Sequence, residues 1–227
     1  MPFFMRIRKK KWAEPELSQC DFYIPEPEKY KGKWKSFFNN DNPIMLEVGC
    51  GKGGFVGQMA LLHPEINFIA VDIKLDMLGV GRRAIVKMFE ENNRSVDNIA
   101  LVKYNVENLD EIIDVTDDIQ RIYINFCNPW PREKHKKRRL TYPKKLKMYR
   151  HFLPDNHEIH FKTDDDNLFE ESLEYFESEK FALCDVTYDL HNSEIDPAVT
   201  PMTEHEKMFS DEGIKIKYCV ARKMQKG

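Results

Sequence analysis

The chain has 227 residues and a formal net charge of −3, with 41% hydrophobic and 32% charged residues. This length and balance are typical of one globular α/β domain, and we expect a single domain over residues 1–227. No apolar run approaches the roughly 20 residues of a membrane span, and the first residues lack the apolar core of a signal peptide. We therefore expect a cytoplasmic protein without a membrane anchor.

The chain opens with a cluster of cations. Residues 1–13 are expected to form a flexible basic arm that contains Arg6, Arg8, Lys9, Lys10 and Lys11. A run of this kind is most often only solvated, whereas the adjacent Trp12 favours a binding role. After several prolines, residues 28–38 are expected to form a short helix that covers one end of a sheet.

The stretch from residue 44 to residue 74 predicts a strand, a glycine turn, a helix and a second strand. Gly49 and Gly51 let the backbone turn sharply into the start of the helix, where free N–H groups favour a polar or anionic ligand. Asp72 closes the second strand. An acid at that position accepts hydrogen bonds from the ribose of a nucleoside cofactor in doubly wound sheets.

Two cofactors fit this pattern, and Glu47 favours one of them. The glycines at 49, 51 and 54 satisfy the dinucleotide fingerprint, so they do not separate NAD from S-adenosylmethionine (SAM). A carboxylate just ahead of the first glycine is unfavourable beside a pyrophosphate but favourable beside the sulfonium and ammonium groups of SAM. The sequence EVGCGKG also resembles the first motif of class I SAM-dependent methyltransferases. A glycine-rich turn without a nucleotide is the alternative for this segment alone.

The rest of the chain alternates between strands and helices. The expected strands are 99–102, 121–126 and 157–161, and the expected helices are 75–93, 109–115, 143–152 and 167–177. Residues 181–188 and 214–221 are expected to form a terminal antiparallel pair. This order predicts an α/β fold with a doubly wound, mostly parallel seven-stranded sheet, which binds ligands at the carboxyl ends of its strands.

Cysteines and histidines give no sign of a metal site. The five cysteines are scattered without a C-x-x-C pair, which is typical of a reduced compartment. Among the seven histidines, His157 and His160 are three residues apart in an expected strand, so their side chains should point to opposite faces. We expect no structural metal.

The most basic segment follows the fourth expected strand. Asn128, Pro129, Trp130 and Pro131 offer an amide, a stiff turn and an aromatic ring, and a loop with fixed φ angles loses little entropy when it holds a planar base. Residues 132–150 then contain ten cations and one acid. An enzyme that acts on a nucleic-acid base needs such a slot beside phosphate-binding charge. For the loop alone, a proline-rich turn with Trp130 in the core is the alternative.

The sequence NPWPREKHKKRRL closely resembles the DPWPxxxHxKRRL motif of the bacterial tRNA (guanine-N7)-methyltransferases. The resemblance covers nearly the whole chain, including the glycine loop, HFKTD at 160–164 and MTEHEKMF at 202–209. These enzymes have a class I methyltransferase fold and use SAM to methylate N7 of the variable-loop guanosine of tRNA, at position 46.

The resemblance implies roles for individual residues. Contacts to SAM are implied for Glu47, Gly49, Gly51, Asp72, Asn105 and Asn128, the last also as the catalytic residue. Contacts to the substrate are implied for Arg132, Asp164, Thr203, Glu204, His205 and Glu206. Contacts to RNA are implied for Lys134, His135, Lys136, Lys137, Arg138 and Arg139.

Two positions depart from the family pattern. Asn105 stands where an aspartate is common, and its amide can both accept from the adenine amino group and donate to the ring. Asn128 stands where the family usually has aspartate. Guanine N7 has an in-plane lone pair, so methyl transfer needs alignment, worth ~7 to 11 kcal/mol, and no prior deprotonation. An asparagine can orient the base but cannot act as a general base.

Some of the implied residues also have purely structural explanations. Thr203 and Glu206 are spaced as a capping box, and Asp164 follows a strand where a helix cap is common. Structure and substrate contact are compatible at these positions.

The sequence thus predicts a SAM-dependent tRNA guanine-N7 methyltransferase that acts as a monomer or homodimer. The first competitor is a methyltransferase for another RNA base or an exocyclic amine, because Asn128-Pro129-Trp130 is similar to the NPPY loop of amino-group methyltransferases. The second is a tRNA-binding protein without catalysis at Asn128. An NAD-dependent oxidoreductase is disfavoured by Glu47 and by the basic loop.

Overall fold

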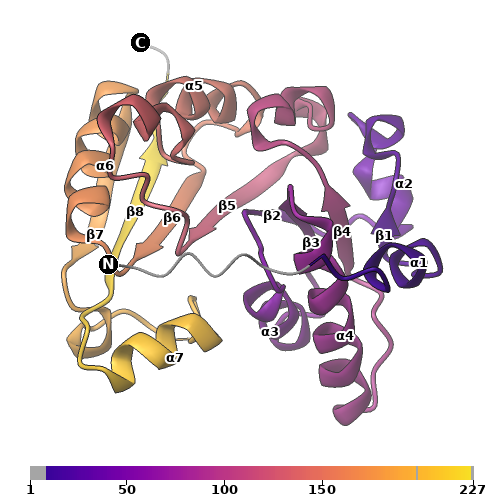
Figure 1. Cartoon of the computed structure of the whole chain (residues 1–227). Helices are drawn as coiled ribbons and strands as arrows, with labels where there is room; N and C mark the ends of the chain where they lie inside the picture. The colour runs from indigo at the N-terminus through magenta and orange to yellow at the C-terminus, as the bar shows by residue number, and fades with distance from the viewer. Residues whose placement is uncertain (1–8, 198, 226–227) are drawn as a thin grey trace.

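Strands and helices alternate through most of the chain, as Figure 1 shows for residues 9–197 and 199–225, the part that this computed structural model describes. The strands are β1 (Tyr23–Ile24), β2 (Ile44–Val48), β3 (Asn67–Asp72), β4 (Ile99–Lys103), β5 (Ile119–Asn125), β6 (Glu158–Thr163), β7 (Phe181–Thr187) and β8 (Lys217–Lys223). The α-helices are α1 (Ala13–Ser18), α2 (Trp34–Phe38), α3 (Gly54–Leu62), α4 (Leu75–Glu91), α5 (Pro143–Phe152), α6 (Asp166–Ser178) and α7 (Glu204–Asp211). Short 3₁₀-helices are η1 (Pro27–Tyr30), η2 (Val106–Glu111), η3 (Val115–Asp117), η4 (Glu133–Arg138) and η5 (Leu190–Asn192).

The eight strands form one sheet in the order β1-β4-β3-β2-β5-β6-β8-β7. The six strands from β1 to β6 in that order are parallel, and β8 runs antiparallel to both β6 and β7. This arrangement confirms the expected doubly wound α/β fold with a terminal antiparallel pair. The sheet has one strand more than the seven expected. The additional strand, β1, has only two residues, which are too few for an alternating pattern to show in the sequence.

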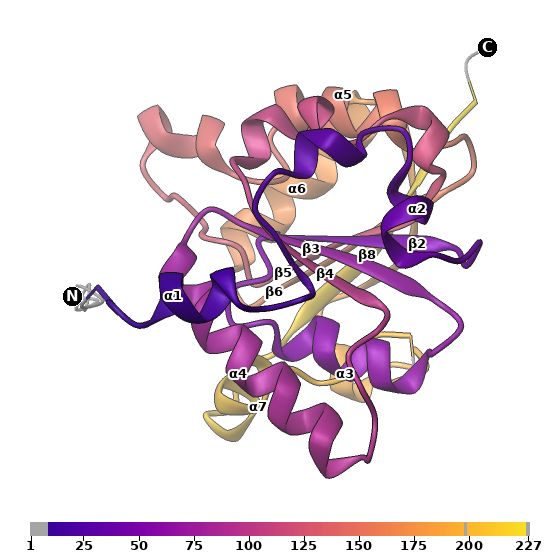
Figure 2. The same cartoon turned by 90° about the vertical axis from the view of Figure 1, so that its right-hand side faces the viewer.

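Helices cover both faces of the sheet. Figure 2 shows α2, α5 and α6 on one side and α1, α3, α4 and α7 on the other. Along β5, Ile122 and Ile124 pack in one core cluster with Tyr149 of α5, whereas Tyr123 between them contacts Phe55 of α3. The two-residue repeat of a strand produces this alternation. The parallel strands end together at one edge of the sheet, where the glycine turn lies.

Two expected helices differ in the structure. Residues 109–115 do not form an α-helix, because the side chains of Asn105 and Asp114 accept hydrogen bonds from backbone N–H groups two residues on and begin the short turns η2 and η3. Such local bonds compete with a continuous helix. The expected helix over residues 28–38 is divided into η1 and α2.

The first described residues pack against α4. The guanidinium carbon of Arg83 lies 3.5 Å from the ring centroid of Trp12. Gly79 permits the close approach of α1, since a Cβ there would lie 2.5 Å from the Cβ of Ala13. The part of the expected flexible arm from Lys10 to Ala13 thus packs against α4, and residues 1–8 lie outside the described chain. No α-helix in the described part is both long and apolar enough to cross a membrane.

Candidate functional site

The glycine turn between β2 and α3 has the backbone shape that only glycine adopts readily. Gly49 and Gly51 have φ angles of 80° and 54°. The N–H groups of Gly49 and Cys50 both donate to the carbonyl oxygen of Val71, at 2.8 and 3.0 Å, so the turn is fixed to the neighbouring strand β3. The turn leads directly into the first residues of α3, where N–H groups without helical partners are available to a ligand.

A cavity of about 380 Å³ opens beside this turn. Its wall combines the ends of β2 and β5 with the starts of α3 and α7. The lining residues that matter for its chemistry are Glu47, Gly51, Phe55, Asn125, Phe126 and His205. The cavity therefore lies at the carboxyl ends of the parallel strands, where doubly wound folds bind their ligands.

Glu47 is the most unusual group in the cavity wall. Its side chain is only 3% exposed, and its Oε1 accepts a hydrogen bond from Asn125 Nδ2 at 3.2 Å. Its Oε2 is buried and has no hydrogen-bond partner among the described residues. Burial raises the pKa of Glu47 to about 8, against the opposing effects of Asn125 and the positive charge of Lys162. A buried carboxylate with a free oxygen is suited to a cationic or hydrogen-bond-donating ligand.

Asp72 and Asn105 stand at the ends of β3 and β4 but outside the residues that line the cavity. Asp72 Oδ2 accepts from the N–H of Gly51 at 2.9 Å, and its Oδ1 accepts from that of Lys74 at 2.7 Å. Each carboxylate oxygen can accept a second hydrogen bond. Asn105 is exposed, and its Oδ1 accepts from the N–H of Glu107 at 3.1 Å.

Asn128 lies on an exposed turn next to the cavity wall. Its Oδ1 accepts a hydrogen bond from the N–H of Trp130 at 3.1 Å. Phe126 and Trp130 have φ angles of 48° and 42°, an uncommon backbone shape for residues other than glycine. Phe126 lines the cavity, whereas Asn128 does not. Asn128 therefore follows the cavity-lining Phe126 by two residues, on a turn with a strained backbone.

The segment around Thr203 closes the cavity on the side of α7. Thr203 and His205 line it, and the ring of His205 lies 5.4 Å from that of Phe126. Thr203 and Glu206 form the expected capping box, in which Thr203 Oγ1 accepts from Glu206 N and Glu206 Oε2 accepts from Thr203 N. Glu206 is itself buried and lies outside the cavity wall. The side chain of Glu204 is outside what the structure describes.

Asp164 follows β6 directly and is half-buried. Burial raises the pKa of its carboxyl group, and the charge of His205 acts in the opposite direction. Its backbone carbonyl accepts a hydrogen bond from Lys217 Nζ at 2.9 Å. The helix cap of α6 is supplied by Asp165, whose Oδ1 accepts from the N–H of Leu168. The Asp164 carboxyl group is therefore not used as a cap.

The basic loop, residues 132–139, divides into exposed and buried cations. The exposed ones are Arg132, Lys134, Lys137 and Arg138. The guanidinium of Arg138 lies 5.0 Å from the ring centroid of Trp130, and the ring of His135 contacts the same indole at 5.8 Å. Desolvation and the neighbouring cations lower the pKa of His135.

Arg139 differs from the other residues expected to contact RNA, because it is buried. Its side chain is 1% exposed, its Nε donates to the carbonyl oxygen of Pro129 at 2.7 Å, and its Nη1 donates to Glu171 at 2.9 Å. It therefore anchors the loop to α6 and is not available to a ligand. Lys136 pairs with Glu133 and Glu171, at 2.7 and 2.9 Å, and is less free than its exposed neighbours.

Similarity to known proteins identifies the family of this chain. A family model described as a putative methyltransferase matches residues 41–219. The tRNA (guanine-N(7)-)-methyltransferase of Clostridium beijerinckii is 56% identical over 219 residues, which are 96% of this chain and 99% of that protein. The protein of the same name from Acetivibrio thermocellus is 46% identical over 219 residues, covering 96% and 100% of the two chains. The chain belongs to the tRNA (guanine-N(7)-)-methyltransferase family.

Solved structures support the fold of this tRNA (guanine-N(7)-)-methyltransferase family member. The 16S rRNA methyltransferase KamB has a TM-score of 0.61 at 10% identity, with 85% of this chain and 93% of that chain covered. A variant of the 16S rRNA (adenine(1408)-N(1))-methyltransferase from Catenulisporales acidiphilia has a TM-score of 0.59 at 11% identity, covering 89% and 93%. The resemblance seen in the sequence is thereby confirmed at the level of family and fold.

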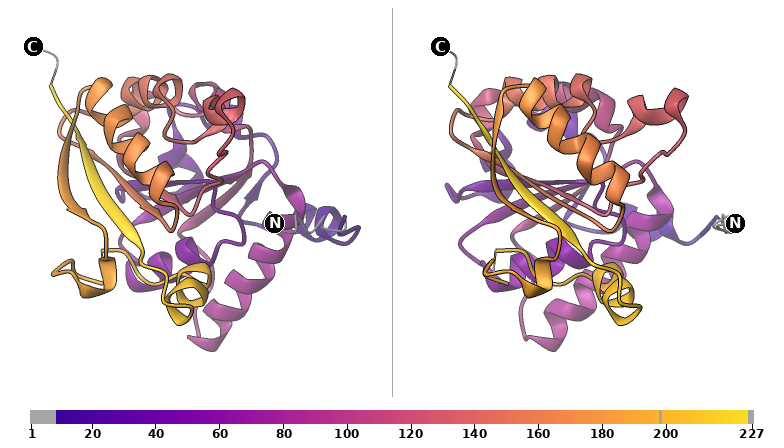
Figure 3. Two further views of the ribbon diagram at one scale, coloured as in Figure 1. Left: turned by 60° about the vertical axis from the view of Figure 1, so that its left-hand side comes forward. Right: turned by 90° about the vertical axis from the view of Figure 1, so that its left-hand side faces the viewer.

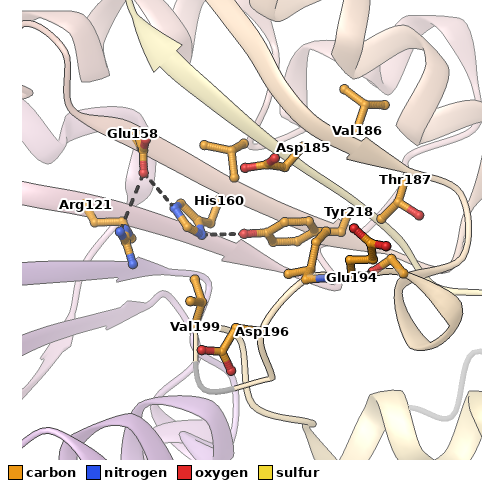
Figure 4. A pocket seen from close by; sticks show the side chains of 13 residues that line it. Arg121, Glu158, His160, Asp185, Val186, Thr187, Glu194, Asp196, Val199 and Tyr218 are labelled. Carbon is orange, nitrogen blue, oxygen red and sulfur yellow. Dashed lines mark hydrogen bonds and ion pairs between the residues drawn. The ribbon is translucent and has the colours of Figure 1, made fainter.

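A larger cavity, of about 710 Å³, lies beneath β6, β7 and β8 (Figure 4). The charged and aromatic groups at its centre are hydrogen-bonded to one another. His160 contacts Glu158 Oε2 at 3.1 Å through Nε2 and the Tyr218 hydroxyl at 2.6 Å through Nδ1. Burial lowers the pKa of His160 to about 4, so its ring is neutral at neutral pH. Hydrogen bonds from His160 and Arg222 lower the pKa of Glu158 to about 2. This cavity adjoins the amino-terminal half of β6, away from the glycine turn, and the smaller cavity is the candidate active site of the family member.

Several residues of the site are not among those expected from the sequence. Asn125 orients Glu47, while Phe55 and Phe126 supply aromatic walls to the cavity. Asn125 carries a readable signal, because it is a polar residue at the carboxyl end of an apolar strand. The described residues contain no group of three or more His, Cys, Asp or Glu arranged to hold a metal ion.

Proposed function

We propose that this chain is a SAM-dependent tRNA methyltransferase that forms 7-methylguanosine at the variable-loop guanosine of tRNA. Relatives with the corresponding name are 45% to 56% identical over nearly the whole chain. The structural observation that carries the proposal is the free Oε2 of buried Glu47 beside the glycine turn. The positive charge of a cationic cofactor offsets the negative charge of that carboxylate, whereas the pyrophosphate of NAD would place more negative charge beside it.

The residues around the turn fit SAM. Glu47 is suited to its cationic methionine end, and Asp72 retains accepting capacity on both oxygens for the ribose hydroxyls. The N–H groups of the turn and the start of α3 offer donors, and we assign adenine contacts to Asn105 at the end of β4. When bound, SAM supplies an electrophilic methyl group on a sulfonium sulfur.

The chain's own residues then have to hold guanine N7 in line with that methyl group. N7 already has an in-plane lone pair, so no side chain needs to remove a proton, and alignment is worth ~7 to 11 kcal/mol. We assign this alignment to Asn128 on the strained turn and to Thr203 and His205 at the cavity wall. We also assign to Asp164, whose carboxyl group has no capping role, the acceptance of hydrogen bonds from the guanine base.

We assign the binding of tRNA backbone phosphates to the exposed cations of the basic loop. Arg132, Lys134, Lys137 and Arg138 extend from the turn that carries Asn128, so phosphate binding there would set the position of the base. We propose that residues 1–227 act as one domain in the cytoplasm, where tRNA is modified. We propose that the protein acts as a monomer or as a homodimer.

Methylation of total tRNA with methyl-labelled SAM tests this function. After digestion to nucleosides, the label should appear in 7-methylguanosine. Label in another methylated nucleoside would redirect the proposal to a different base, and tRNA binding without any label would leave only a binding protein. The variant Glu47→Ala is a matched control, because it should abolish labelling while the basic loop still binds tRNA.

A further inference from the structure

Lys162 is a buried cation on β6, beside two aromatic residues of the cavity wall. Its side chain is fully buried, which is rare for a lysine. Its Nζ donates to Glu206 Oε2 at 2.6 Å and to the carbonyl oxygen of Pro201 at 3.3 Å. Burial lowers the pKa of Lys162, and the attraction of Glu206 opposes that shift.

The partners of Lys162 belong to the start of α7. Glu206 is 1% exposed, and the same Oε2 that binds Lys162 also accepts from the N–H of Thr203 in the capping box. Pro201 lies two residues before Thr203. One ammonium group therefore fixes the chain on both sides of Thr203, which lines the cavity. Figure 3 shows α7 beside β8 and on the same side of the sheet as α3 and α4.

The ammonium group of Lys162 also lies near two aromatic rings of the cavity wall. Its Nζ lies 5.7 Å from the ring centroid of Phe55 and 6.0 Å from that of Phe126. Phe126 in turn contacts the ring of His205 at 5.4 Å. Cations at such distances are attracted to aromatic faces, and the attraction is stronger in a desolvated setting.

We propose that Lys162 is a positioning residue for methyl transfer, which holds the start of α7, and with it Thr203 and His205, against the cofactor cavity. This inference rests on the proposed function for its effect on rate. A buried ion pair is weak evidence for stability, since apolar or neutral groups of similar volume often replace it without loss. Its directional bonds to Pro201 and Glu206 instead define where a loop-flanked helix begins, and a neutral pair would not reproduce them.

The double variant Lys162→Met/Glu206→Gln separates positioning from stability. The single Lys162→Met change leaves Glu206 buried without its cation and can prevent folding. The double variant removes both charges of the Lys162–Glu206 pair, so neither is left buried without the other. The Glu206→Gln change keeps the capping box because a glutamine side chain also serves at that position. We expect the double variant to melt within a few degrees of the parent protein, while the amides of residues 206 and 207 exchange with solvent roughly tenfold faster.

Single-turnover methylation of tRNA at saturating SAM gives the second readout, with an expected loss of roughly ten- to a hundredfold in rate. Lys223→Met is the matched control: Lys223 is 8% exposed and binds the carbonyl oxygens of Arg150 and Leu153 at the far end of β8. It should change neither readout. Parental exchange in the double variant, or parental rate despite faster exchange, would overturn the proposal. If the parent protein methylates no tRNA, the proposed function fails while the exchange result still decides whether Lys162 holds α7.

Discussion

Glu47 is the residue whose charge state should change when the cofactor binds. Its pKa of about 8 in the cofactor-free protein means that the carboxyl group is mostly protonated at neutral pH. A cationic ligand favours the ionised form, so SAM binding at about pH 7 should release up to about one proton. Calorimetric titrations in two buffers with different ionisation enthalpies measure this release. Equal binding enthalpies in both buffers would contradict it, and Glu47→Gln should show neither the release nor the full affinity.

The same pKa shift sets how the stability of the cofactor-free protein depends on pH. The folded protein holds the Glu47 proton more tightly than the unfolded chain, whose pKa is near 4.5. The stabilisation is therefore present below that value and is lost as the pH rises through about 8. Glu47→Gln should melt higher than the parent near pH 9, with the advantage gone near pH 4.5. Thermal denaturation at the two pH values measures the difference, and a constant offset between the proteins would contradict the assignment.

Asn128 departs from the aspartate that its family usually carries. Its Oδ1 accepts a hydrogen bond from the N–H of Trp130, and an aspartate oxygen would accept the same bond. We therefore expect the native protein and Asn128→Asp to methylate tRNA at similar rates. Asn128→Ala should lose on the order of ten- to a thousandfold, or ~1.4 to 4 kcal/mol of alignment. Single-turnover rates decide this, and an inert native enzyme rescued by aspartate would show that a carboxylate is chemically required.

At the scale of elements, the basic loop should act through its exposed cations only. If Arg132, Lys134, Lys137 and Arg138 each neutralise one phosphate, log K for tRNA should fall with log salt with a slope of about −3 to −4. Lys134→Ala/Lys137→Ala should make that slope shallower by ~1 to 2 and leave SAM affinity unchanged. Filter binding across a salt series measures it. Lys87→Ala, an exposed lysine on α4, is the control, and an unchanged slope in the double variant would mean that the loop is only a solvated face.

The same loop shows where a sequence stops being informative. Arg138 and Arg139 are adjacent and chemically identical, yet the first is exposed and the second is buried against Glu171, 32 residues further along the chain. A charge run predicts a basic surface, but only tertiary contacts decide which cations are used inside the protein. Asn125 shows the opposite case, since its place at the end of an apolar strand was a signal that could have been read.

At the scale of the whole molecule, the fold could be predicted because each local signal agreed with the same sheet. The glycine turn, the apolar strands and the helical repeats predict the parallel part, and the structure confirms it. The terminal pair was predicted, but not that β8 would lie between β6 and β7. Both edges of β8 pair antiparallel, and periodicity within a strand does not say which neighbour lies on each side.

Cofactor binding should also be visible in the stability of the whole molecule. A ligand that binds only the folded state stabilises it by RT ln(1 + [L]/Kd), or ~2.7 kcal/mol at a hundred times its Kd. For a domain of this size that corresponds to a rise in Tm of roughly 5 to 11 °C. SAM should produce this shift, because the cavity that Glu47 lines forms only when β2, β5 and α7 are assembled. NAD should not produce it. Thermal denaturation with each ligand measures it, and a shift with NAD but none with SAM would mean that the free oxygen of Glu47 serves a different cofactor.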